Sequence, residues 1–163
     1  MDTFSHGAWT YLILKNHPKR WLVVWGMVFP DIAILGLGSF LLLKGNLHVF
    51  KPLLQQLYSV PLVPFIDTAF HSLIIWIILF LVFFINHFVN AKWFFFGVFS
   101  HIGIDILTHK HFIPRYLWPI SDTSISGLID YRTLLFMAID ILLLLSFTFW
   151  SIKKLINIKN DLH

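Results

Sequence analysis

The chain has 163 residues, of which 58% are hydrophobic and only 12% are charged, and its mean hydropathy is +0.78. This composition excludes an ordinary soluble domain and is typical of a polytopic membrane protein. The absence of cysteine excludes disulfides and thiolate ligands, so a bound metal would need nitrogen and oxygen ligands. The net charge of +4 comes from Lys and Arg at the ends of apolar runs, which indicates membrane anchoring and not nucleic-acid binding.

The predicted elements are all helices within a single membrane-embedded domain over residues 1–163. A short interfacial helix is expected over Thr3–Leu14, followed by a polar turn at 16–20. Four longer apolar runs are expected to cross the membrane, since about 20 residues span a bilayer. They are Trp21–Leu43, Pro64–Phe88, Trp93–Thr108 and Thr133–Trp150. The prediction is an all-α fold with four transmembrane helices, a short N-terminal helix and an exposed basic tail over 153–163.

The orientation follows from the number of spans. Four spans place the turn at 15–20, the turn at 89–92 and the C-terminal tail on one side of the membrane. That side carries more Lys and Arg than the other. Because positive residues favour the cytoplasmic side, both termini are expected in the cytoplasm.

The third predicted span carries His101 and Asp105 four residues apart. On a helix this spacing puts both side chains on one face, where an imidazole and a carboxylate can share a metal ion. Gly97 and Gly103 form an adjacent ridge of small residues with Ser100, and such ridges mark helix contacts in membranes. The ligand face is therefore expected to point into the bundle, with the large apolar residues directed elsewhere. The residues directed elsewhere are Phe94, Phe95, Phe99 and Ile106, and 94–96 is expected to face lipid.

Further ionisable residues lie in the other apolar runs, where they are expensive and usually functional. They are His6, Asp31, His71 and Asp140. His71, His101 and Asp140 lie at similar depths, about 10–12 Å from the same ends of their spans. A kink at Pro30 and a hairpin at Pro18 would bring Asp31 and His6 to a similar level. The sequence therefore permits convergence of these side chains.

Each residue alone has a simpler interpretation. His6 could hydrogen-bond a neighbouring helix, Asp31 could cap a kinked helix, and Asp140 could serve packing or a relay. His17, His109 and His111 are expected to be solvated loop residues, although membership of Asp140, His109 and His111 in the site stays open. Burying unpaired carboxylates costs several kcal/mol, and one cation would neutralise several at once. Metal binding is therefore preferred for four residues together: Asp31, His71, His101 and Asp105.

The same residues resemble a known pattern, that of the inner-membrane metal-dependent hydrolases. This bacterial and archaeal family is also described as LexA-binding, membrane-associated hydrolases. The main match is G-x-x-S-H-x-x-x-D-x-x-T, which runs from Gly97 to Thr108. The other matching pieces are Ser5-His6, Pro30-Asp31 after a glycine-containing run, His71-Ser72, and Trp118-Pro119-Ile120-Ser121. The resemblance covers about residues 3–122 and implies a bacterial or archaeal inner-membrane protein.

The chain departs from this family at two places. Ala33 stands where the family often has a second Asp, and Ile66-Asp67-Thr68 stands where it often has His-Arg-Gly. The order of His and Asp residues is also similar to zinc-dependent phospholipase C. That similarity implies five zinc ligands: His6, Asp31, His71, His101 and Asp105.

The predicted function is metal-dependent hydrolysis of a phosphoester or lipid-like substrate, with Asp31, Asp67 and Asp105 as catalytic residues. Zn²⁺ is the first candidate metal and Mn²⁺ or Mg²⁺ the next. His6 would be a fifth ligand or would hold a second ion. Asp67 lies one helical turn before His71 and would orient His71.

The expected partners are membrane lipid and a lipid-phosphate substrate. Three outer-loop cations could hold a phosphate or simply be solvated: Lys110, Arg115 and Arg132. The alternatives are a metal-ion transporter and a non-catalytic scaffold; the oligomeric state is not predicted.

Overall fold

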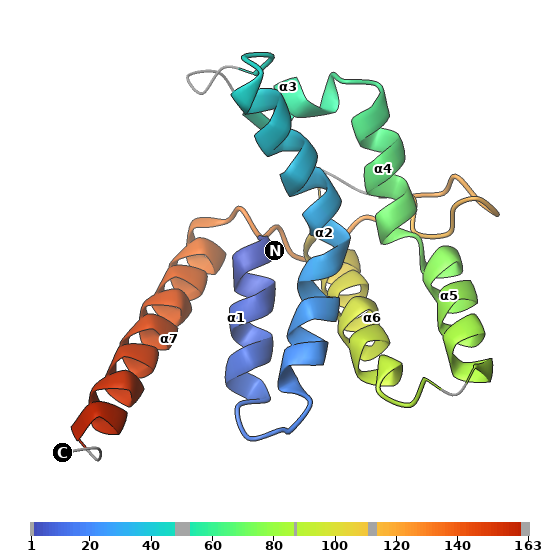
Figure 1. Cartoon of the computed structure of the whole chain (residues 1–163). Helices are drawn as coiled ribbons and strands as arrows, with labels where there is room; N and C mark the ends of the chain where they lie inside the picture. The colour runs from blue at the N-terminus through green and yellow to red at the C-terminus, as the bar shows by residue number, and fades with distance from the viewer. Residues whose placement is uncertain (1, 48–52, 87, 111–113, 161–163) are drawn as a thin grey trace.

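The computed structural model describes residues 2–47, 53–86, 88–110 and 114–160 (Figure 1). These residues form seven helices and no strand, which confirms the all-α prediction. The helices are α1 (Thr3–Ile13), α2 (Arg20–Leu43), α3 (Leu53–Tyr58), α4 (Leu62–His71), α5 (Leu73–Ile85), α6 (Ala91–Thr108) and α7 (Leu134–Asn160).

Two helices in the described part of the chain are long and apolar enough to cross a membrane. They are Arg20–Leu43 in α2 and Leu134–Lys153 in α7, and α4 with α5 makes a third if the bent pair crosses as one span. α6 is not among them. A membrane protein is therefore indicated, and the prediction of four spans is not confirmed.

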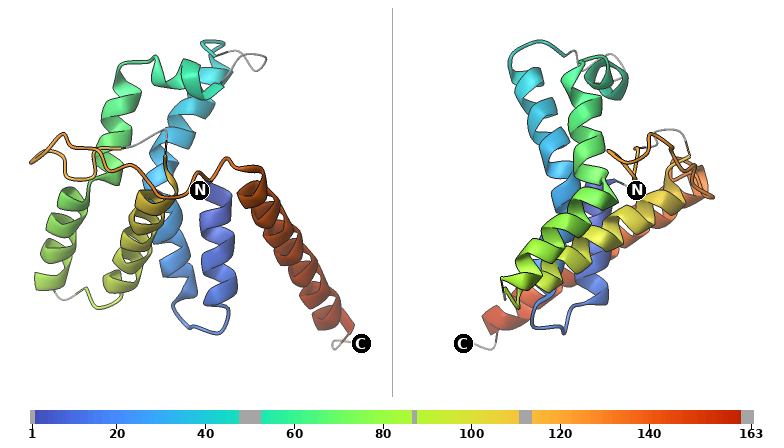
Figure 2. Two further views of the ribbon diagram at one scale, coloured as in Figure 1. Left: turned by 180° about the vertical axis from the view of Figure 1, so that it is seen from behind. Right: turned by 90° about the vertical axis from the view of Figure 1, so that its right-hand side faces the viewer.

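α2 is the central helix of the fold. It packs against α1, α6 and α4, whereas α7 packs against α1 and leans away from the other helices (Figure 1). The two further views show α1 and α6 beside the first half of α2, with α5 on the far side of α6, and α3 with α4 beside the second half of α2 (Figure 2). Pro30 lies between these halves, where it removes one helical hydrogen bond. The middle of α2 is therefore the level at which both groups of helices meet.

Two glycines bring the backbones of α2 and α6 into direct contact. A Cβ atom on Gly26 would lie 1.9 Å from the Phe94 carbonyl oxygen, and one on Gly97 would lie 2.2 Å from that of Val23. Gly103, expected on the same ridge, is exposed, and a Cβ atom there would have no neighbour within 4 Å. Phe95 was expected to face lipid, and this prediction is wrong. Its side chain is buried in a core cluster because α5 covers that face of α6. The close approach thus depends on Gly26 and Gly97.

The predicted span Pro64–Phe88 is two helices instead of one. α4 ends at His71 and α5 begins at Leu73, with a bend of 52° between them. Ser72 caps α5 by accepting a hydrogen bond from the Ile75 amide, and its hydroxyl donates to the Trp118 carbonyl oxygen. The Leu73 amide donates to the Tyr116 carbonyl oxygen at 2.8 Å. The loop at 116–118 therefore supplies the carbonyl oxygens that accept from Ser72 and Leu73 at the break.

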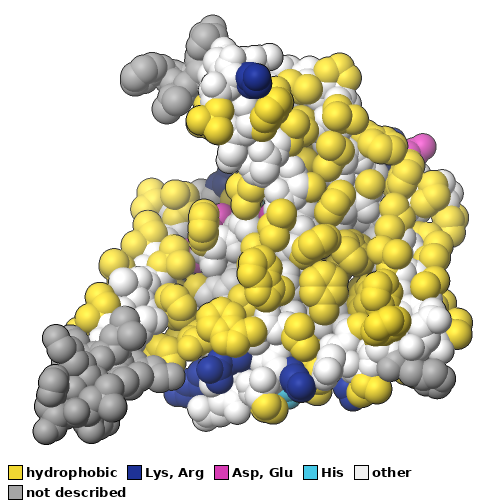
Figure 3. Space-filling model, viewed as in Figure 1, with side chains coloured by type: hydrophobic (Ala, Val, Ile, Leu, Met, Phe, Trp, Pro, Cys, Tyr) yellow, Lys and Arg dark blue, Asp and Glu magenta, His cyan; other side chains and the backbone are white. Residues whose placement is uncertain are grey.

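The α1–α2 turn, the α5–α6 connection and the C-terminal end of α7 lie at the same end of the molecule (Figure 1). Lys and Arg side chains gather along this end, below a surface that is largely hydrophobic (Figure 3). The part of α7 that could cross a membrane ends at Lys153, where the basic tail was expected to begin, and the helix continues to Asn160. Asp2, which caps α1, lies at the other end of that helix. The location of both termini in the cytoplasm stays a prediction.

Candidate metal centre

Two buried histidines from different helices face each other at the centre of the fold. His71 is the last residue of α4 and His101 lies in the middle of α6, and their Nε2 atoms are 3.2 Å apart. The Nδ1 atom of His101 lies 2.6 Å from the Met27 carbonyl oxygen, and that of His71 lies 2.9 Å from the Asp67 carbonyl oxygen. A carbonyl oxygen only accepts, so both Nδ1 atoms carry hydrogen. In neutral rings both Nε2 lone pairs then point toward one place.

Two carboxylates complete this cluster. Asp31 Oδ1 lies 3.4 Å from His71 Nε2 and 3.7 Å from His101 Nε2. Asp105 Oδ2 lies 3.1 Å from His101 Nε2 and 3.7 Å from His71 Nε2. Ligand atoms about 2.0–2.2 Å from one tetrahedral cation are separated by roughly 3.3–3.6 Å. Ligand atoms that all lie within 4.8 Å of one another form two groups that share His101: one is Asp31, His71 and His101, and the other is His6, His101 and Asp105. Either group could hold a metal ion.

The position of Asp31 depends on α1 as well as on α2. Asp31 follows Pro30 at the level where the two halves of α2 meet, and its side chain is 20% exposed. The Thr3 hydroxyl donates to Asp31 Oδ2 at 2.7 Å, which leaves Oδ1 directed toward the histidines. The first turn of α1 thus orients a carboxylate that the second helix supplies.

Asp67 lies one turn before His71, as the sequence predicted. Its Oδ1 atom is 3.1 Å from His71 Nδ1, on the side of the ring that faces away from the cluster. A carboxylate in this position fixes the tautomer and orientation of a ligating histidine. Asp67 therefore acts on the cluster through His71.

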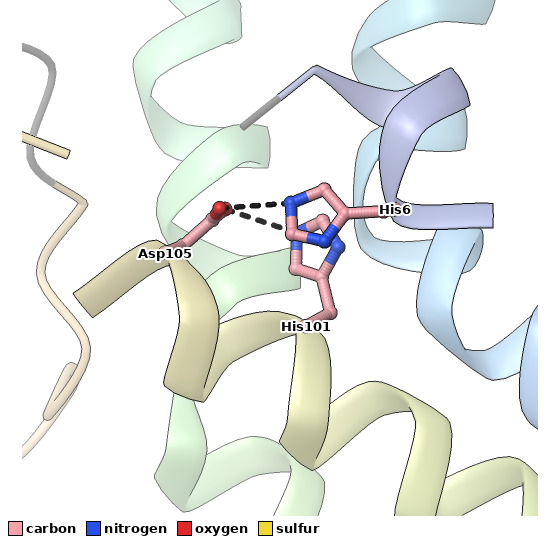
Figure 4. Close-up of side chains that lie close together, drawn as sticks. All are labelled: His6, His101 and Asp105. Carbon is pink, nitrogen blue, oxygen red and sulfur yellow. Dashed lines mark hydrogen bonds and ion pairs between the residues drawn. The ribbon is translucent and has the colours of Figure 1, made fainter. Parts of the chain in front are cut away.

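His6 contacts the cluster through the second oxygen of Asp105. Figure 4 shows His6 and His101 approaching Asp105 together, with a distance of 2.9 Å between His6 Nε2 and Asp105 Oδ1. The His6 and His101 rings lie 4.2 Å apart, and both side chains are fully buried. His6 Nδ1 has no hydrogen-bond partner within the described residues. The fold brings His6 to the predicted site, where it could ligate an ion or hold Asp105 in place.

His109, whose membership in the site the sequence left open, lies beside the cluster. The sequence predicts a solvated side chain, but this one is only 14% exposed and its Nδ1 lies 3.2 Å from Asp105 Oδ1. The loop that follows α6 causes this burial. The Gly127 amide donates to the His109 carbonyl oxygen, and the Tyr131 ring lies 4.9 Å from the His109 ring. The spacing of His101, Asp105 and His109 at i, i+4 and i+8 could have identified it. His111 lies outside the described residues.

Asp140 lies apart from the four-residue cluster. It accepts hydrogen bonds from the Ser5 hydroxyl at 2.5 Å and from Trp9 Nε1 at 3.4 Å. The Ser5 hydroxyl also lies 2.6 Å from Asp2 Oδ2. These contacts join α7 to α1, which agrees with the packing interpretation of Asp140.

A cavity of about 210 Å³ opens onto the cluster. Besides the clustered residues, its polar lining includes Asp2, Thr3, Tyr58, Asp67, His109 and Tyr131. Burial raises the pKa of Tyr58 and Tyr131, so both phenols are protonated and can donate hydrogen bonds at neutral pH. The described lining contains no Lys or Arg.

The three loop cations that were expected to be able to hold a phosphate lie outside the lining of this cavity. Arg115 pairs with Asp122 at 2.7 Å, and Arg132 lies 3.4 Å from Asp130. Lys110 is exposed and is not part of the cavity lining. An anionic group in this cavity would therefore depend on a bound cation and on the neutral donors.

Comparisons with protein-family models, with curated proteins and with solved structures found no match for this chain.

Proposed function

We propose that the protein is a membrane-embedded, metal-dependent hydrolase of a phosphoester or lipid-like substrate. The observation that supports this proposal best is the donor set around His71 and His101. Each Nε2 atom lies between 3.1 and 3.7 Å from the other Nε2 atom and from one oxygen of Asp31 and of Asp105. Without a cation, a proton would have to lie between the two facing Nε2 lone pairs. A divalent ion would satisfy all four residues together.

Zn²⁺ is the metal that we propose first, because its tetrahedral sites with His and Asp have ligand separations in this range. Mn²⁺ and Mg²⁺ prefer octahedral sites with more oxygen ligands, so they are the second choice. A bound divalent ion would lower the pKa of a coordinated water toward about 7 and polarise a phosphoryl oxygen.

The residues of the chain would prepare this chemistry in three ways. Asp31, His71, His101 and Asp105 would hold the ion. Asp67 would keep the proton on His71 Nδ1, and the Met27 carbonyl would do the same for His101. Tyr131 lines the same cavity and would donate a hydrogen bond to an anionic group of the substrate. Asp31 and Asp105 would thus be catalytic through the ion, and Asp67 a positioning residue.

We further propose that the chain crosses a bacterial or archaeal cytoplasmic membrane four times. α2, the α4–α5 pair, α6 and α7 would be the spans, and α6 would be tolerated because its polar face is buried against α2. The basic end of the molecule would face the cytoplasm with the C-terminal tail.

The test is turnover of a lipid phosphoester by reconstituted wild type and His101→Ala. His17→Ala is the matched control, because that histidine also contacts an aromatic ring, Trp93, but lies in the α1–α2 turn. We expect His101→Ala to abolish turnover and His17→Ala to retain it, with both variants monodisperse by size exclusion. Equal turnover by wild type and His101→Ala would refute the hydrolase. Metal flux into proteoliposomes without turnover would favour a transporter.

A further inference from the structure

The cavity at the cluster has one polar side and one apolar side. The polar side carries the cluster, and the apolar side is formed by Ile34 and Leu35 of α2 with Leu54 of α3. Leu35 is 44% exposed and Leu54 is 41% exposed, so the apolar side lies at the surface. Leu35 belongs to Arg20–Leu43, a helix long and apolar enough to cross a membrane. The apolar side of the cavity therefore faces the lipid phase.

The size of the cavity limits what can enter it. Pockets that enclose drug-sized ligands have volumes of about 300–1,000 Å³. A cavity of about 210 Å³ can hold a headgroup but cannot enclose a whole lipid. The apolar chain of a bound lipid must therefore lie outside the cavity. The exposed leucines provide the apolar surface on which it can do so.

From this geometry we infer that the substrate is a membrane amphiphile that enters from the bilayer past the exposed side chains of Leu35 and Leu54. Its phosphoester headgroup reaches the metal centre, and its apolar chain lies against Leu35 and Leu54. This inference rests on the metal centre of the proposed function and adds the class of the substrate and its route. Leu35 and Leu54 are specificity-determining residues in this arrangement, because they contact the chain and not the reacting group.

The charge of the cavity makes headgroup binding depend on the metal. Four carboxylates line the cavity, and no Lys or Arg does so within the described residues. The lining carboxylates are Asp2, Asp31, Asp67 and Asp105. Without a cation, an anionic phosphoester would meet like charges in a partly desolvated site. Removing the metal should therefore release the headgroup and, with it, the chain at Leu35 and Leu54.

The experiment uses a lipid phosphonate, which is not hydrolysed, with a photoreactive diazirine on its chain. Wild type is reconstituted in phosphatidylcholine vesicles with a trace of this probe, either loaded with Zn²⁺ or stripped by a chelator. Labelled peptides are quantified at Leu35, at Leu54 and at Leu142 of α7. Leu142 is the control for ordinary lipid contact, because it is 64% exposed and lies outside the cavity lining.

We expect stripping to lower labelling at Leu35 and Leu54 at least about tenfold, which corresponds to about 1.4 kcal/mol of headgroup binding. Labelling at Leu142 should not change. Excess phosphonate without the diazirine should also suppress labelling of Leu35 and Leu54 in the loaded protein, which tests the same point without removing metal. The inference would be overturned if labelling at Leu35 and Leu54 stayed the same after metal removal and in the presence of excess phosphonate.

A kinetic comparison separates this inference from the proposed function. Leu35→Gln combined with Leu54→Gln should raise KM for a long-chain phosphoester and leave turnover of a short-chain, water-soluble analogue unchanged, whereas Leu142→Gln should affect neither. Equal effects on both substrates would contradict the inference while leaving hydrolysis intact. Metal-dependent labelling without hydrolysis of either substrate would support the binding route and contradict the hydrolase.

Discussion

His71 and His101 direct their Nε2 atoms toward each other at 3.2 Å, while the Nδ1 atom of each ring faces a backbone carbonyl oxygen. Two neutral rings held in this way present two lone pairs at close range, which is unfavourable unless a proton or a cation lies between them. Asp31 and Asp105 contact the same two nitrogens. The backbone therefore preorganises an arrangement that a divalent cation would stabilise.

Asp67→Asn should weaken the metal centre without destroying it. Asp67 contacts His71 Nδ1 at 3.1 Å and the amide would still reach that atom, but it would not favour the donor tautomer as strongly. Loss of such an outer contact typically lowers metal affinity or activity about 10–100-fold. Zinc titration of the stripped protein and turnover measure the two effects. A loss as complete as that of His101→Ala would instead make Asp67 a ligand.

Gly97→Ala should destabilise the fold, and Gly103→Ala on the same helix should not. The new Cβ at position 97 would lie 2.2 Å from the Val23 carbonyl oxygen, so α2 and α6 would have to separate. Overpacking of this kind costs about 1–3 kcal/mol or more. Position 103 is open, so its methyl group meets no neighbour. Thermal unfolding in detergent measures both variants, and equal midpoints would contradict the direct contact of the two backbones.

Four membrane spans should give opposite accessibility to the two ends of the molecule. The chain has no cysteine, so an introduced cysteine would be the only thiol that a maleimide can label. Asn16→Cys and Asn90→Cys lie in the α1–α2 and α5–α6 connections, and Ser124→Cys lies in the loop before α7; all three positions are exposed. A membrane-impermeant maleimide added outside intact cells should label position 124 only. Labelling of all three positions from one side would contradict four spans.

The sequence predicted the polar cluster better than it predicted the helix boundaries. The i, i+4 pair His101 and Asp105 and the Pro30-Asp31 step carry local signals of their position, and the fold brings both to His71. The break at Ser72 could not be predicted, because the groups that stabilise it belong to Tyr116 and Trp118, far along the chain. Helix periodicity depends only on the spacing of neighbouring residues, so it cannot predict a helix break that is stabilised by a distant loop.

The burial of His109 illustrates the same limit. Its helical spacing from Asp105 was visible, but α6 ends at Thr108 and a residue after a helix is expected to be solvated. The loop at 127–131 returns to this position and pairs with the backbone groups at the end of α6. Gly127 permits this, since a Cβ there would lie 2.8 Å from the Leu107 carbonyl oxygen. Only the tertiary fold shows that this loop covers His109.

Metal content in chelator-free preparations tests the central claim most directly, with Asp105→Asn compared against Asp140→Asn. Asp105 contacts His101, His6 and His109, whereas Asp140 contacts Ser5 and Trp9. We predict about one tightly bound divalent ion per chain in wild type and in Asp140→Asn, and a loss of that ion in Asp105→Asn, because removing a charged ligand lowers affinity sharply. Elemental analysis that finds no metal in wild type, even after addition of Zn²⁺ or Mn²⁺, would contradict the metal centre. A metal retained by Asp105→Asn and lost by Asp140→Asn would contradict its assignment to these residues.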